Sequence, residues 1–369
     1  MWTIWREEFY KIASRKIIWL GIFLLLSFVT FRLVAERDTY TITRDGERFW
    51  GKEAVKKDRE LTAALAGRLT EEKIRQIYDQ YGFFYYDFEG NRVGNFCNRF
   101  ITEKFTNFMQ TDGNKPEEIQ FYQGEEWEQN VVPYLEQEVQ WDYVYGWNDL
   151  SEMLWLSFLI VLIILSIGLS PVFAEEYTLG TADILLTTRR GKQSGIWMKM
   201  LAALFFSILL TVTVILYLFG IYLRIYGTQG LDASAVLLNF AGFYGYIPKT
   251  VQGFFLFTVS MELIGVLLFT GIVMGISAWS RSAFLAVIFS LILLVLPIVW
   301  VKVFSAMWIF GVTVTKWITH FMVSMPVYLS VSTGFAFSKR DIMLHLLLAM
   351  FVGTGAILFA YRRYRNYQG

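Results

Sequence analysis

Cysteine and histidine are scarce in this chain of 369 residues, which contains one cysteine, Cys97, and two histidines, His320 and His345. A single cysteine excludes an intramolecular disulfide framework and a metal cluster built from several thiolates. We therefore expect Cys97 to be an ordinary small apolar residue. The two histidines do not form the H-x-x-x-H pattern of zinc hydrolases, and the G-x-S-x-G motif of serine hydrolases does not occur. The sequence thus predicts neither a metal site nor a hydrolase.

The chain also lacks an excess of either charge, because 33 Lys and Arg residues stand against 32 Asp and Glu residues. Nucleic-acid-binding domains are usually strongly basic, so a net charge of +1 argues against a nucleic-acid partner. Apolar residues are abundant instead. Hydrophobic residues make up 55% of the chain, aromatic residues 18%, and the mean hydropathy is +0.42. This composition exceeds that of soluble domains and predicts a multi-pass protein of a cell membrane, surrounded by lipid.

Six apolar runs approach the roughly 20 residues that a membrane-spanning helix needs. These runs are Ile17–Val34, Met153–Phe173, Met200–Leu223, Phe254–Trp279, Ala283–Val301 and Ile342–Tyr361. The fold class that they predict is an all-α integral membrane protein with six transmembrane helices.

The segment Val303–Gly334, between the fifth and sixth runs, is apolar but contains Lys316, His320 and Pro326. It fits either a seventh span or two shorter helices that dip into the outer leaflet. Lys and Arg residues gather at one set of ends of the six runs, as the positive-inside rule requires. A seventh span would move the basic tail after Tyr361 to the outside. We therefore expect re-entrant helices here, packed against protein or a water-filled cavity.

The charge pattern places both termini in the cytoplasm and divides the chain into four parts. The expected parts are an interfacial helix with the first span at 1–35, an extracellular domain at 36–152, spans two to six at 153–361 with a cytoplasmic loop at 174–199, and a cytoplasmic tail at 362–369.

The first residues combine apolar and charged side chains at helical spacing. Trp2, Trp5, Phe9 and Ile12 recur on one face, with charged residues between them, which is typical of a helix in the membrane interface. A basic stretch before an apolar run also resembles a signal peptide. The run is nearly long enough to span a membrane, so we expect an uncleaved anchor.

The segment Glu36–Glu152 is the one sizeable polar part, with 24 Asp and Glu against 14 Lys and Arg by direct count, a net charge of −10. It predicts a mostly helical extracellular domain. Thr70 is a candidate N-cap with acidic residues in the following turn, and Ile74 and Ile77 would supply an apolar face. A second apolar face is formed by Phe96, Phe100, Phe105 and Phe108. Aromatic stripes of this kind more often form a core than a ligand site, although such a domain could also gate or receive an amphipathic cargo.

One carboxylate, Glu262, lies well inside the fourth apolar run, and an intramembrane carboxylate is a candidate for the transport pathway. A structural hydrogen bond to a neighbouring helix or a protonated acid is an equally good interpretation. Gly271 and Gly275 form a G-x-x-x-G pattern that lets two helices approach closely, which we expect to occur within the subunit. His345 begins the last run, where we expect a hydrated interface.

The polar segment between the second and third runs, 174–199, has an ordered arrangement of acidic, small, apolar and basic residues. In order, it contains Glu175, Glu176, Tyr177, Gly180, Thr181, Leu185, Leu186, Arg189, Arg190 and Lys199. This arrangement resembles the first cytoplasmic loop of permeases in the ABC transporter type-2 export family. The short helices expected before the last span agree with the resemblance, because permeases of that family also have them.

The resemblance implies a permease subunit of an ATP-driven exporter that moves a hydrophobic or amphipathic substrate, such as a peptide antibiotic, a lipid or a drug. It implies a separate ABC ATP-binding subunit, contacted through Glu175 to Arg190, and a second permease subunit, identical or different. The chain itself is not expected to be an enzyme. Gly46–Lys52 matches the P-loop pattern only in part, because Glu53 replaces the Ser or Thr that meets magnesium. ATP and magnesium would bind to the partner, and no cofactor to this chain.

An ATPase-independent membrane protein is the alternative. A secondary transporter should show inverted repeats and several charged residues near the membrane midplane, and the sequence shows no repeat. A membrane sensor could use the extracellular domain as its receptor, but it would usually require a cytoplasmic output domain.

Overall fold

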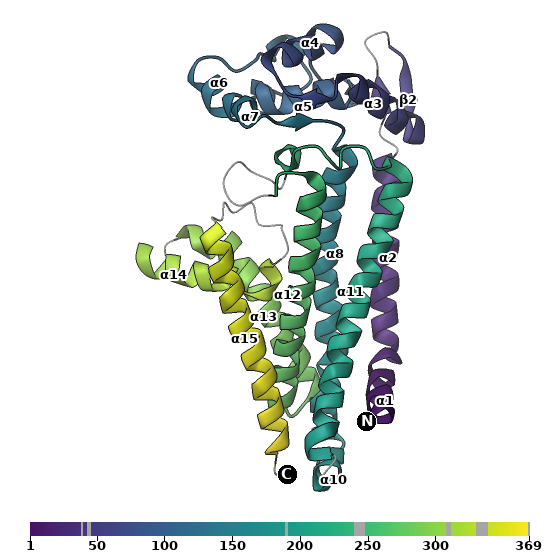
Figure 1. Cartoon of the computed structure of the whole chain (residues 1–369), viewed down its shortest axis with the longest axis vertical. Helices are drawn as coiled ribbons and strands as arrows, with labels where there is room; N and C mark the ends of the chain where they lie inside the picture. Colours follow the sequence, from purple (N-terminus) through teal and green to yellow (C-terminus); the bar gives the residue numbers. More distant parts are fainter. Residues whose placement is uncertain are drawn as a thin grey trace.

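The chain folds into a long helical bundle with a small domain at one end (Figure 1). The computed structural model describes residues 1–37, 40–42, 46–188, 191–239, 248–307, 311–329 and 339–367. We call the end with the small domain apical. The opposite end, where the chain termini lie, we call basal.

The bundle contains ten α-helices among the described residues: α1 (Trp2–Ala13), α2 (Lys16–Arg37), α8 (Tyr145–Leu169), α9 (Pro171–Thr178), α10 (Thr181–Thr187), α11 (Ile196–Tyr226), α12 (Val251–Trp279), α13 (Ala283–Lys302), α14 (Val312–Val323) and α15 (Lys339–Arg365). Short turns of other helix types join them: η3 (Gly191–Gly195), η4 (Ala235–Leu237), η5 (Phe304–Met307) and η6 (Pro326–Tyr328).

Six helical segments among the described residues are long and apolar enough to cross a membrane, and they coincide with the six predicted runs. Helix α11 exceeds the predicted run at both ends. Its 31 residues extend over about 46 Å, against about 30 Å for the hydrocarbon core of a bilayer. The third span is therefore longer than the hydrocarbon core that it would cross.

The segment between the fifth and sixth spans forms short helices in its described parts. Helix α14 has 12 residues, about 18 Å, which is too short to cross a bilayer. Figure 1 shows it at the side of the bundle, near α13 and the start of α15. The short helices predicted for Val303–Gly334 are present in this form, although residues 308–310 and 330–338 lie outside the described residues.

The predicted close approach of two helices at the G-x-x-x-G pattern is confirmed. A side chain at Gly271 would lie 2.8 Å from the carbonyl oxygen of Gly353, and one at Gly275 would lie 3.3 Å from that of Ala356. The two glycines therefore allow α12 and α15 to pack backbone against backbone within one chain.

The apical domain consists of helices α3 (Gly51–Leu65), α4 (Glu71–Tyr81), α5 (Phe96–Phe105), η1 (Asn107–Gln110), η2 (Pro116–Glu118), α6 (Glu125–Asn130) and α7 (Val132–Glu136). Three antiparallel pairs of short strands accompany them: β1 (Tyr40–Ile42) with β2 (Arg48–Trp50), β3 (Gly67–Arg68) with β6 (Gln140–Trp141), and β4 (Tyr85–Tyr86) with β5 (Arg92–Val93). The P-loop-like stretch thus forms β2 and the first turn of α3.

Several predictions for this domain are confirmed. The Thr70 side chain accepts a hydrogen bond from the backbone N–H of Lys73 and caps α4, and Ile74 and Ile77 are buried. The phenylalanines of the second predicted face are buried around α5, and Cys97 lies among them without solvent exposure.

The apical domain is joined to the bundle around Gln229, which follows α11. The Arg59 side chain of α3 donates to the Gln229 side chain at 3.2 Å, and Gln229 donates to Asp142 at 2.8 Å. The indole N–H of Trp147, in α8, donates to the Gln229 carbonyl at 2.6 Å. One glutamine therefore ties α3 to the apical ends of α8 and α11.

Helix α1 forms as predicted, but much of its apolar face packs on protein. The rings of Trp5 and Phe9 contact Phe205 of α11, at centroid distances of 5.4 and 5.8 Å, and Ile12 is buried. Trp2 remains exposed. The spacing of apolar residues predicted a face toward the membrane interface, whereas α11 covers most of it.

Candidate functional site at the basal end

The predicted coupling segment folds into two short helices at the basal end. Helix α8 ends before Pro171, whose missing N–H interrupts the helical hydrogen bonds, and α9 continues from there. Gly180, with φ of +64°, then turns the chain into α10 through a conformation that other residues adopt only with strain. Figure 1 shows α10 at the extreme basal tip of the molecule.

The break at the start of α9 is held by Ser277 of α12. The backbone N–H groups of Phe173 and Ala174 donate to the Ser277 hydroxyl at 2.9 and 3.1 Å. That hydroxyl donates in turn to the Ser170 carbonyl at 2.6 Å. The Tyr177 hydroxyl donates to the carbonyl of Ala278 at 3.0 Å. Helix α9 is therefore bound to α12 at both of its ends.

A buried ion pair joins α9 to α11. The ammonium group of Lys199, in α11, contacts one carboxylate oxygen of Glu176 and lies 3.5 Å from a carboxylate oxygen of Glu8 in α1. It also donates to the Val172 carbonyl at 3.3 Å. The Tyr364 hydroxyl of α15 donates to the second carboxylate oxygen of Glu176. We call Glu8, Glu176, Lys199 and Tyr364 the basal network.

Because the network is buried, its members depend on one another. A charge removed from water is tolerated only when it is paired and hydrogen-bonded. Lys199 satisfies this condition through its ion pairs and its hydrogen bond. It is stabilised further by the rings of Phe173 and Tyr364, whose centroids lie 5.6 and 5.8 Å from the ammonium group. Removing one member of such a group costs about 3–5 kcal/mol. The basal network thus binds α1, α9, α11 and α15 to one another.

One further ion pair attaches the N-terminal helices to α9, and another holds Glu8 within α1. Arg15, between α1 and α2, contacts Glu175 at 2.5 Å, and Lys11 contacts Glu8 at 2.9 Å. Burial alone would lower the pKa of Lys11, but the hydrogen bond and the charge of Glu8 outweigh it and raise that pKa.

The predicted coupling residues are separated by burial into three groups. Exposed among them are Glu175, Gly180 and Leu185. Half-buried are Tyr177 and Thr181, and fully buried are Glu176 and Leu186. Arg189 and Arg190 lie outside the described residues. A partner protein can touch the first two groups, whereas Glu176 and Leu186 can act only by holding the segment in place.

Two exposed residues at the tip were not singled out from the sequence. Ile184 is 70% exposed, and Leu179, between α9 and α10, is exposed to a similar extent. With Leu185 they form an apolar surface, which we call the tip patch (Leu179, Ile184 and Leu185). The sequence does contain a signal for this patch. Ala182 and Leu186 are four residues apart and mark the buried face of α10, so the apolar residues between them are exposed. Grouped exposed apolar residues on a surface indicate an interaction site.

The intramembrane residues are placed as follows. Glu262 is buried in α12, and Gly265, one turn later, packs against the carbonyl of Pro326 in η6. A role of Glu262 in a pathway stays a prediction. His345 is buried rather than hydrated, and its Nε2 lies 3.4 Å from Nδ1 of His320 in α14. No group of three or more metal-binding side chains occurs in the described parts of the chain.

Taken together, the fold and the basal site define a multi-pass helical membrane protein with the basal network and the tip patch at one end. Residues 2–313 match the model of a family described as ABC-2 family transporter protein. Because the match covers most of the chain, the protein belongs to the ABC-2 transporter family, as the segment 174–199 had suggested. No curated protein and no solved structure matches the chain.

Proposed function

We propose that the chain is the permease subunit of an ATP-driven exporter and that a separate ATP-binding subunit docks on the tip patch. The observation that carries this proposal is the position of an exposed apolar surface directly beside a buried ion network. Family membership supports a partner of this kind. ATP and magnesium would bind to that partner, and this chain would supply the membrane path.

The contacts of α9 explain how movement of the partner would reach the spans. Helix α9 is bound to α12 through Ser277, to α11 through Lys199 and to α15 through Tyr364. A shift of α10 therefore cannot be absorbed by α9 alone. It would move three spans together as a rigid body, which is a common form of switching between two states.

The distribution of basic residues supports an orientation of the chain in the membrane. Lys192 and Arg281 lie near basal helix ends, and α15 ends in Arg362, Arg363 and Arg365. We propose that the basal end faces the cytoplasm of a bacterial cell and that the acidic apical domain lies outside. A second permease subunit would complete the path for a hydrophobic or amphipathic cargo. Family membership favours this assignment over the alternative of a secondary transporter or a sensor.

A photo-crosslinking experiment tests the docking surface. A photoreactive amino acid at position 184 should crosslink, in native membranes, to a polypeptide that an azido-ATP analogue also labels. The matched control is the same amino acid at Phe88, an exposed apolar position at the apical end. Ile184→Glu should lower recovery of the ATP-labelled partner about ten-fold without changing the amount of this chain. A partner that binds no ATP, or equal crosslinking from position 88, would contradict the proposal.

A further inference from the structure

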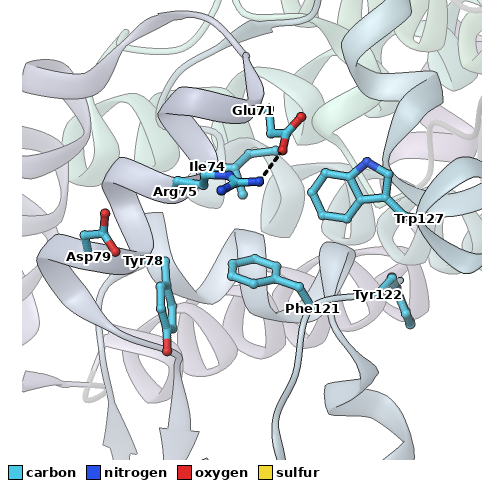
Figure 2. A pocket seen from close by; sticks show the side chains of 8 residues that line it. All are labelled: Glu71, Ile74, Arg75, Tyr78, Asp79, Phe121, Tyr122 and Trp127. Carbon is cyan, nitrogen blue, oxygen red and sulfur yellow. Dashed lines mark hydrogen bonds and ion pairs between the residues drawn. The ribbon is translucent and has the colours of Figure 1, made fainter. Parts of the chain in front are cut away.

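The apical domain contains an open cavity that the basal site does not explain. Its volume is about 500 Å³, and it lies between α4 and the segment that leads into α6. Figure 2 shows apolar side chains facing it from both sides. We call these residues the aromatic groove (Ile74, Tyr78, Phe121, Tyr122 and Trp127).

The rings of the groove are positioned by contact with each other. The centroids of Tyr78 and Phe121 are 5.3 Å apart in an edge-to-face arrangement, and those of Phe121 and Trp127 are 6.4 Å apart. Ile74 is buried, whereas Tyr78 is exposed and the other rings are half-buried. The groove is therefore an ordered apolar surface in contact with solvent, and little further ordering would be needed for a ligand to bind.

The charges around the groove select the sign of a ligand. Arg75 forms an ion pair with Glu71 at 2.7 Å, seen above the groove in Figure 2, so its positive charge is compensated. Asp79 adds a further carboxylate to the lining. Trp127 lies between Glu126 and Glu128 in α6, and the segment 36–152 carries the net charge of −10 given above. Such a field attracts cations and repels anions.

We propose that the aromatic groove binds a cationic peptide segment in which an aromatic or aliphatic side chain stands beside Lys or Arg. The apolar side chain would lie between Tyr78 and Trp127. The cation would lie over the indole face, where the ring attracts positive charge, at the Glu71 side of the groove (Figure 2). The proposal rests on the proposed function only in treating this peptide as cargo of the exporter. A neutral lipid would gain nothing from the acidic surroundings, and an anionic lipid would be repelled.

Direct binding to the full chain tests the proposal without an ATP-binding subunit. The chain is reconstituted in phosphatidylcholine nanodiscs, and the probe is a short fluorescent peptide of lysine, leucine and tryptophan. The control peptide has every lysine replaced by glutamate. We expect saturable binding of the lysine peptide that weakens with salt, and no binding of the glutamate peptide.

Variants locate the site. Trp127→Ala and Tyr78→Ala should each weaken binding at least about ten-fold, and Trp127→Phe should retain most of it. Phe88→Ala, which removes an apolar side chain that is 95% exposed and outside the groove, should leave binding unchanged. Equal affinity for both peptides, or lysine-peptide binding that survives Trp127→Ala in a folded chain, would overturn the proposal. If the wild-type chain does not bind the lysine peptide while the partner still crosslinks at position 184, this inference is overturned and the proposed function is left intact.

Discussion

The helices of the bundle are joined at its basal and apical ends by the same kinds of side chain in different surroundings. At the basal end, Lys199 and its carboxylate partner are buried, with 5% and 10% of their side chains exposed. At the apical end, Arg32 contacts Glu152 at 2.9 Å with 33% and 39% exposed, and also lies 3.6 Å from Asp149. Each end has a tyrosine, and the apical one, Tyr222, donates to Asp149.

Burial makes these similar groups act differently. An exposed ion pair is screened by water and contributes at most about 1 kcal/mol. A buried network must stay complete, because any member left alone is a charge or a polar group without compensation. The basal network should therefore move as a unit, whereas the Arg32–Glu152 pair at the apical end can open and close at little cost.

The largest expected effect concerns the side of the membrane on which each end lies. Single cysteines at Glu72 and Glu118, both exposed in the apical domain, should react with an impermeant maleimide in intact cells. A cysteine at Gln193, exposed at the basal end, should react only after permeabilisation. Labelling of position 193 from outside would reverse the orientation.

The native Cys97 serves as an internal control in that experiment. Burial raises its pKa to about 12, so the thiol stays protonated and inaccessible at neutral pH. The contribution of the neutral thiol to stability is fully present below its unfolded pKa of 9.0, and it is lost as the pH rises through the folded value. We expect the wild-type chain to react at neutral pH only after denaturation.

The next largest effect tests the completeness of the basal network. Lys199→Met removes the cation and leaves the carboxylate of Glu176 buried without an ionic partner, so we expect a loss of about 3–5 kcal/mol. Adding Glu176→Gln should restore part of that stability. Thermal unfolding of the purified variants measures both. If the two substitutions are simply additive, the residues do not form a coupled network.

The smallest effect is expected at the Arg32–Glu152 pair. Arg32→Ala should cost less than Lys199→Met, because Glu152 remains accessible to water and Asp149 keeps its hydrogen bond from Tyr222. Raising the salt concentration to 1 M should reduce this difference further, since the screening length is then about 3 Å. Unfolding measured at low and high salt checks this. An effect as large as that of Lys199→Met would remove the distinction between the two ends.

The spans, the capped start of α4 and the segment at the basal tip could be predicted from the sequence, because each depends on residues close together in the chain. The pairing of Glu176 with Lys199 could not, since only the packing of helices brings them together. The same holds for His320 and His345, which share no local pattern. Periodicity identified the apolar face of α1, but not α11 as the surface that covers it.

The uninterrupted length of α11 gives it the properties of a lever. It runs without a proline from the basal network to the glutamine that fastens the apical domain. Over its length of about 46 Å, a tilt of about 5° displaces the far end by about 4 Å. A small adjustment at one end is therefore enlarged at the other. Ligand binding in the apical domain and partner binding at the tip patch would in this way be coupled through one helix.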